Sequence, residues 1–164
     1  EKEDSYKSGV LISFIIKSLS DEKFYDVRSE LIECLTSLVM RVHRAGKHSY
    51  LPSFHKGRKI YKKILIEEKD YGIVHKLLRL LYYLPDVKLL ETVVILIKRT
   101  PDDIYESIKK NIFDLFNSLS SHNHEKNYPI LRERLKELMR SPDKIMASRA
   151  EEIYFDFIKG LRLI

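Results

Sequence analysis

Two stretches of this 164-residue chain match each other at a fixed offset of 41 positions. The match includes a turn, because Thr100-Pro101-Asp102 aligns with Ser141-Pro142-Asp143. On both sides of the turn the aligned residues belong to the same class: Leu90, Val94, Ile97, Arg99, Ile104, Ile112, Phe113 and Phe116 align with Leu131, Leu135, Leu138, Arg140, Ile145, Ile153, Tyr154 and Phe157. A Pro-Asp turn is not part of helical periodicity, so the match indicates an internal repeat of about 40 residues.

Apolar residues recur at three- and four-residue spacing along almost the whole chain, and this spacing predicts helices with buried faces. The first two predicted stripes are Val10, Leu11, Phe14, Ile15, Ile16 and Leu19, and then Val27, Leu31, Cys34, Leu35 and Leu38. Ile130 and Ile145 belong to later stripes of the same kind. No alternating run bounded by hairpin turns indicates a strand, so the predicted fold class is all-α.

The helical stripes group into about four antiparallel hairpins within one domain over residues 1–164. Their predicted bounds are 6–43, 58–84, 86–119 and 127–161. Pro85 ends one helix and Asp86 stands at the N-cap position of the next. Glycine and proline interrupt the pattern over residues 45–57, which we predict as a long basic loop with room for a short helix.

Three segments resemble the turn and second helix of HEAT and armadillo-like repeats. They are "LIKRTPDDIYESIKKNIFDLFNSL", "LKELMRSPDKIMASRAEEIYFDFIKGL" and "LSDEKFYDVRSELIECLTSLV", the last with Asp26-Val27-Arg28 placed like that family's Asp-Val-Arg element. The unit 58–84 departs from the pattern, because its first helix is short and its turn, 67–71, lacks proline. The resemblance implies a right-handed α-solenoid of stacked hairpins that acts as a protein-interaction scaffold. A helical bundle without repeats is the alternative.

Composition narrows the class of protein. A charged fraction of 33% with only five glycines and five prolines favours long helices in a soluble chain. The longest apolar runs are too short to span a bilayer. The start Glu1-Lys2-Glu3-Asp4 lacks methionine and any secretory signal, so we expect an excised part of a larger protein. The single cysteine fits an intracellular compartment, nucleus or cytoplasm.

The sequence offers little support for catalysis or for a cofactor. None of the glycines forms a phosphate-binding loop. Neighbouring acidic pairs such as Glu151-Glu152 diverge on a helix and are expected to be solvated. Cys34 with His43 or His48 as base is a possible nucleophile, but its place in an apolar stripe favours a core cysteine. The histidines show no zinc-binding spacing and are expected at the surface. We therefore predict no enzyme, no cofactor and no metal site.

The strongest surface signal is a run without acidic residues between Glu33 and Glu67 that carries eight positive charges, so the rest of the chain sums to −2. The candidate partner-binding residues are Arg41, Arg44, Lys47, Lys56, Arg58, Lys59, Tyr61, Lys62 and Lys63. This surface suits an acidic or phosphorylated protein or peptide. The second hypothesis is that this surface binds nucleic acid through phosphate contacts, and the third is that it is a solvated surface without a direct role.

Thr100-Pro101 and Ser141-Pro142 have the pattern of proline-directed phosphorylation sites. Both stand at repeat turns, where a hydroxyl can cap a helix end, and we favour this structural role.

Overall fold

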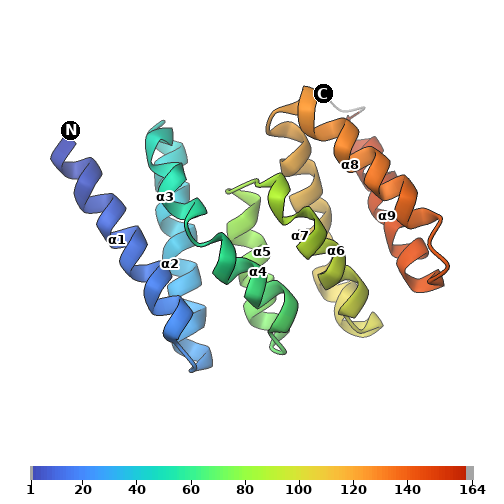
Figure 1. Ribbon diagram of the computed structural model, residues 1–164, viewed down its shortest axis with the longest axis horizontal. Coiled ribbons are helices and arrows are strands. Elements are labelled where there is room, and N and C mark those ends of the chain that lie inside the picture. The colour runs from blue at the N-terminus through green and yellow to red at the C-terminus, as the bar shows by residue number, and fades with distance from the viewer. Residues whose placement is uncertain (1, 162–164) are drawn as a thin grey trace. The chain divides into compact units, whose positions relative to one another are not determined.

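The computed structural model describes the backbone of residues 2–161 and the side chains of residues 9–159, and all its regular elements are helices (Figure 1). The all-α prediction is confirmed for this part of the chain. The chain divides into two compact units, unit 1 over Glu1–Leu84 and unit 2 over Pro85–Ile164. No helix within residues 2–161 is long and apolar enough to cross a membrane.

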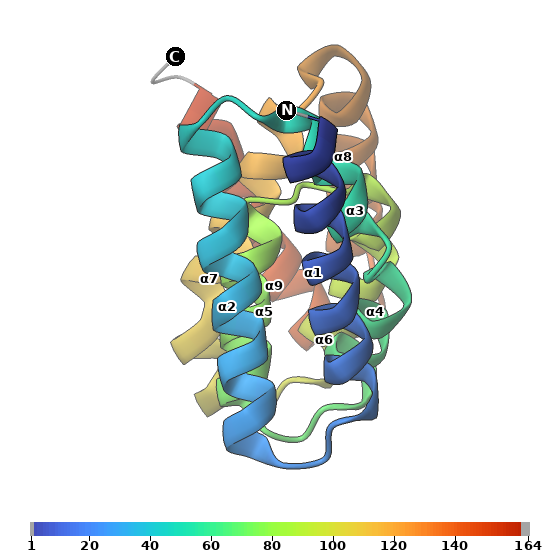
Figure 2. The same ribbon diagram turned by 90° about the vertical axis from the view of Figure 1, so that its left-hand side faces the viewer.

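Unit 1 consists of two layers of helices. Its elements are α1 (Lys2–Asp21), α2 (Tyr25–Arg44), η1 (His48–Tyr50), α3 (Leu51–His55), α4 (Arg58–Glu67) and α5 (Tyr71–Tyr82). The first layer contains α1, which packs on α3 and α4, and the second contains α2, which packs along α5 (Figure 2). Within the unit, α1 packs on α2, α4 packs on α5, and α2 lies against α5.

The predicted loop 45–57 is mostly helical. A short turn around Gly46 leads into η1 and α3, with Pro52 near the start of α3, where its fixed φ suits the first turn. Phe54 on α3 is fully buried, and this apolar anchor fixes a segment that glycine and proline mark as irregular. The short helix allowed for inside the predicted loop is present, and the remaining irregular residues form short turns before and after it.

The first two predicted stripes are buried only in part. On α1 the buried residues are Ile12, Ile15, Ile16 and Leu19, and on α2 they are Ser29, Ile32, Leu35, Thr36 and Val39. By contrast, Val10, Leu11, Phe14 and Val27 are exposed, which corrects their prediction as core residues. Apolar residues occupy two sides of each helix, whereas within unit 1 the neighbouring helices bury only one of these sides.

Unit 2 contains η2 (Val87–Leu89), α6 (Leu90–Arg99), α7 (Asp102–Ser121), α8 (His124–Met139) and α9 (Lys144–Leu161). α7 packs on α8 and α9, and α9 also contacts α6. Asp86 caps η2 as predicted, since its side chain accepts a hydrogen bond from the Lys88 amide. The connection between the predicted hairpins 86–119 and 127–161 is only two residues long, because α7 continues to Ser121 and α8 begins at His124.

Five apolar pairs 41 positions apart are buried alike in unit 2, whereas Ile104 is half-buried and Ile145 is exposed. Leu90, Val94 and Ile97 are buried like Leu131, Leu135 and Leu138. After the turn, Ile112 and Phe116 are buried like Ile153 and Phe157. Ile130 and Ile145 are exposed, which corrects their prediction as inward residues.

Arg149 of α9 ties this helix to the end of α6. Its side chain is buried, at 4% exposure, and its guanidinium donates hydrogen bonds to the carbonyl oxygens of Ile97, at 2.5 Å, and Thr100, at 2.7 Å. It also pairs with Asp102 at 2.6 Å and lies 4.2 Å above the ring of Tyr105. Ile97 lies in the last turn of α6 and Thr100 is its C-cap, so their carbonyl oxygens are among those that lack a partner within the helix.

Candidate protein-interaction surface

The structure separates the predicted basic residues into two groups. Arg41 and Arg44 lie in the last turn of α2, and Lys47 follows in the turn after it. Positive charge at a helix C-terminus is stabilising, because it faces the negative end of the helix dipole. Local helix stability is thus a sufficient reason for the two arginines.

The second group lies on and next to α4, where the electrostatics have the opposite sign. Arg58 and Lys59 occupy the first turn of α4, which contains no acidic residue. Positive charge at a helix N-terminus opposes the dipole and costs about 0.3–1 kcal/mol per charge. The helix dipole therefore does not account for the exposed charge of Lys59.

α4 is amphipathic: one face forms core, and the face exposed to solvent is basic. Tyr61, Ile64 and Leu65 are buried. Around them, Lys56, Lys59 and Lys63 are exposed, while Arg58 and Lys62 are half-buried. We call these five basic residues, Lys56, Arg58, Lys59, Lys62 and Lys63, the α4 surface.

Tyr61 does not belong to the interaction surface. Its side chain is only 2% exposed, and its hydroxyl donates a 3.1 Å hydrogen bond to the carbonyl oxygen of Phe54. Burial raises the pKa of the phenol well above its ordinary value, because the charged phenolate would lose its hydration. The predicted partner-binding role of Tyr61 is therefore corrected to a core role that closes α4 against α3.

A pocket of about 360 Å³ adjoins the α4 surface. Lys63 and Ile60 of α4 line it together with Leu19 at the end of α1 and with residues of the two nearby turns. The full lining is Leu19, Ser20, Glu22, Arg28, Ile60, Lys63, Ile64, Glu67, Glu68 and Lys69. This volume lies in the range of small ligand-binding sites.

Part of the charge in this pocket is neutralised internally. Arg28 pairs with Glu68 at 2.5 Å, and Glu22 accepts hydrogen bonds from the amides of Lys23 and Phe24. The Nε of Arg28 is buried and donates to no acceptor within the described residues. Lys63 and Lys69 are exposed at the same pocket, and so is Glu67, so the lining offers charges of both signs to a ligand.

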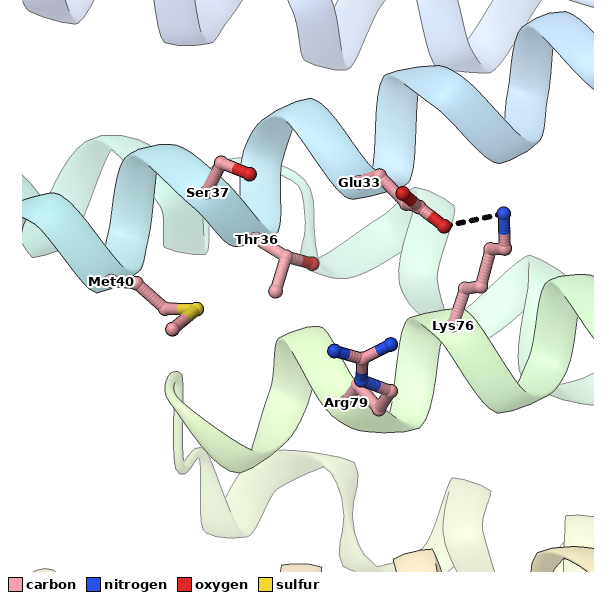
Figure 3. Close-up of a pocket in the computed structure, with 6 residues that line it drawn as sticks. All are labelled: Glu33, Thr36, Ser37, Met40, Lys76 and Arg79. Atoms are coloured by element: carbon pink, nitrogen blue, oxygen red, sulfur yellow. Dashed lines mark ion pairs between the residues drawn. The ribbon is translucent and has the colours of Figure 1, made fainter.

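A second hollow, of about 90 Å³, lies between α2 and α5 (Figure 3). Thr36 and Met40 border it from α2, and Lys76 and Arg79 border it from α5. Lys76 pairs with Glu33 at 2.5 Å, which lowers the pKa of the Glu33 carboxyl and raises the pKa of Lys76. The hollow is too small for a ligand of ordinary size.

The other residues considered for chemistry are not brought together. Cys34 is exposed, which corrects its prediction as a core residue. Cys34 and His43 are nine positions apart, about 13.5 Å along α2, so the two do not form a nucleophile–base pair. His43 contacts the Tyr83 carbonyl oxygen at 2.8 Å and the ring of His48. Within the described residues no three potential ligands gather at one metal site.

The two Pro-containing turns have structural hydrogen bonds. Thr100 is buried, at 3% exposure, and its hydroxyl donates to the Leu96 carbonyl oxygen at 2.6 Å. The Ser141 hydroxyl accepts from the Asp143 amide at 3.2 Å. Thr100 is thus closed to a kinase in the folded chain, whereas Ser141 is half-buried.

Sequence reasoning missed two features of this region. One is the Arg28–Glu68 pair, which joins residues 40 positions apart and leaves no local pattern. The other is Gly57, where an added Cβ would lie 2.5 Å from the Tyr61 ring, so that close packing requires glycine. The proximity of Gly57 to a tyrosine four positions on was the only available signal, and it is a weak one.

Comparisons with known proteins add no relative: no family model, no curated protein sequence and no solved structure matches the chain.

Proposed function

We propose that this chain is a non-catalytic scaffold that binds an acidic segment of a protein partner on the α4 surface. The observation that carries the proposal is the group of exposed lysines on and next to α4, Lys56, Lys59 and Lys63, of which Lys59 lies in the first turn and opposes the helix dipole. Charge that weakens its own helix is expected where an anionic partner compensates for it.

The geometry favours a peptide over nucleic acid. α4 has 10 residues and is about 15 Å long, which accommodates a few acidic side chains of an extended segment. The neighbouring 360 Å³ pocket offers Lys63 and Lys69 to a carboxylate and Ile60 to an apolar side chain. A duplex would need positive charge over a longer stretch, because its affinity depends on the number of phosphates contacted.

We further propose that the hairpins form a HEAT-like α-solenoid. Two observations support it: second helices lie against each other in both units, α2 with α5 and α7 with α9, and five apolar pairs 41 positions apart are buried alike. In a Cys34→Ser background, cysteines at Ser37 and Arg79, which border the same hollow, should be joined by a short bifunctional reagent. Failure to cross-link would contradict the stacking of α2 on α5.

The binding proposal is tested by charge reversal. Lys59→Glu with Lys63→Glu should weaken binding of a fluorescent peptide rich in aspartate and glutamate by about tenfold or more, since each reversal removes an attraction and adds a repulsion. Both lysines are exposed, so the fold should be retained. The matched control is Lys88→Glu with Lys110→Glu, two exposed lysines of unit 2.

The same titration includes single- and double-stranded DNA at several salt concentrations. Peptide binding that is lost in the α4 variant and kept in the control supports the proposal. Tighter DNA binding with a steep salt dependence would replace it with the nucleic-acid function. Binding of neither probe at low salt would overturn both.

A further inference from the structure

The hairpin α1–α2 exposes apolar residues at helical spacing. They are Val10, Leu11 and Phe14 on α1 and Val27, Leu31, Cys34 and Leu38 on α2, and we call this set the outer hairpin face. Phe14 is 66% exposed, while Leu31 and Leu38 are half-buried. Single exposed apolar residues are ordinary, but a continuous patch on a helix pair marks an interaction surface.

The α2 part of this face points away from α5. Its four residues are spaced by four, three and four positions, so at 100° per residue they lie within about 60° of one another. Thr36 and Met40, which border the hollow with α5, lie on roughly the opposite side of the helix. The stripe is thus the side of α2 that the second hairpin leaves open.

The α1 part adjoins the α2 part. Val10 and Phe14 lie opposite the buried side of α1, which is centred near Ile12. Gly9 faces α3, since a Cβ there would lie 3.6 Å from Ser53 Oγ. Leu11 lies about 200° further round, on the side of α1 away from α3. α1 and α2 pack directly on each other. The two stripes therefore form one surface across the hairpin.

Charges beside the face are complementary to those of a second copy. Glu30 and Arg41 are both exposed and border the same edge of the α2 stripe, about 20° apart around the helix. They are 11 residues apart, with a midpoint between Cys34 and Leu38. If two α2 helices met antiparallel about a two-fold axis at this midpoint, Glu30 of each copy would face Arg41 of the other. A closed two-fold interface requires this kind of self-complementarity.

The area suits a weak dimer. The described side chains of α1, from residue 9 to Asp21, cover about 20 Å of helix and α2 covers about 30 Å, so at a width of about 10 Å they present on the order of 500 Å². Two copies would bury on the order of 1,000 Å², the lower limit for a specific interface.

We infer that the outer hairpin face is the interface of a two-fold homodimer, in which apolar residues of α1 and α2 form the centre and Glu30–Arg41 pairs form the rim. This inference is independent of acidic-peptide binding, since the outer hairpin face contains none of the residues of the α4 surface.

Sedimentation equilibrium of the whole chain tests it first. The wild type should be dimeric with a micromolar Kd, and Phe14→Glu or Cys34→Glu should raise the Kd at least about tenfold, since each places a charge in the apolar centre. Phe155→Glu is the matched control, because Phe155 is 52% exposed and lies in unit 2. Unchanged melting, followed by circular dichroism, shows that the variants remain folded.

Charge exchange tests the two-fold geometry. Glu30→Arg alone and Arg41→Glu alone should each weaken the dimer by about three- to tenfold. The double variant should regain the wild-type Kd, as should an equimolar mixture of the two single variants. A short bismaleimide should also join two copies through Cys34.

Three results would overturn the inference. They are a monomeric wild type at about 100 μM, a dimer insensitive to both Phe14→Glu and Cys34→Glu, and a double charge variant no tighter than the single ones. Association with vesicles in place of self-association would assign the face to a membrane surface and equally overturn it.

Discussion

The two units hold their helices together with the same kind of group in different surroundings. In unit 2, the Arg149 guanidinium is buried and has three acceptors at the end of α6 and the start of α7. In unit 1, the ammonium of Lys76 links α5 to Glu33 and Ser29 of α2, but the Lys76–Glu33 pair stands at the edge of a hollow with Glu33 half exposed. An exposed pair contributes little, whereas removing a buried cation leaves its acceptors without partners. Burial, more than charge, decides what each contact contributes.

The units also differ in the charge they carry. Unit 1 has 16 lysines and arginines against 11 acidic residues, and unit 2 has 14 against 13. The positive excess lies mainly in unit 1, together with both proposed interaction surfaces. Unit 2 carries the clearer internal repeat.

The largest expected effect follows from Arg149. Replacement by leucine should lower the free energy of unfolding by about 3–5 kcal/mol, because two carbonyl groups in the last turn of α6 lose their donor. Urea unfolding measures it. Arg149→Lys should restore little, since one ammonium cannot span the same acceptors. A loss below about 1 kcal/mol in the leucine variant would remove the contrast between the units.

Next in size is Gly57→Ala, which tests packing in unit 1. The added Cβ would lie 2.5 Å from a ring that is itself buried, so either the Tyr61 ring or the start of α4 must shift. We expect a loss of about 1–3 kcal/mol in urea unfolding. Gly9→Ala is the control, because its Cβ would make an ordinary contact and alanine favours the helix. Equal effects of the two changes would contradict the close approach at Gly57.

Tyr61→Phe should have a smaller effect that depends on pH. At pH 7 the variant should lose about 0.5–1.5 kcal/mol with the hydrogen bond to Phe54. The folded-state pKa of Tyr61 is raised, so its stabilising contribution is complete below the unfolded value, about 10, and is lost as pH rises towards the folded value. The wild type should therefore lose more stability than Tyr61→Phe between pH 9 and about 11. Parallel losses in urea unfolding at the two pH values would refute the burial of the phenol.

The smallest effect concerns the exposed pair in unit 1. The pKa of Glu33 is lowered chiefly by its hydrogen bond from Lys76, so the contribution of this pair is present above the unfolded pKa and is lost as pH falls through the folded one. In Lys76→Met the pKa of Glu33 should rise towards its ordinary value, as side-chain NMR titration can show, with little change in stability at pH 7. A Glu33 pKa that does not move would exclude Lys76 as its main partner.

The sequence alone determined the all-helical fold, the positions of most turns and the site of the excess positive charge. These properties are local: periodicity of 3.6 residues, proline and aspartate at helix ends, and a run without acidic residues. Asp86 is an example, because its capping role depends only on the two residues that follow it.

Only the tertiary structure decided which apolar residues are covered. The helical period fits two groups of apolar residues equally well. Ile12 and Leu35 are buried, whereas Val10, Phe14 and Cys34 are exposed. Periodicity shows that a side of a helix is apolar, but coverage depends on which other helix packs there, and that contact joins residues far apart in the chain. For the same reason Tyr61 became a core residue and Arg149 a buried bridge, since the groups they meet belong to other helices.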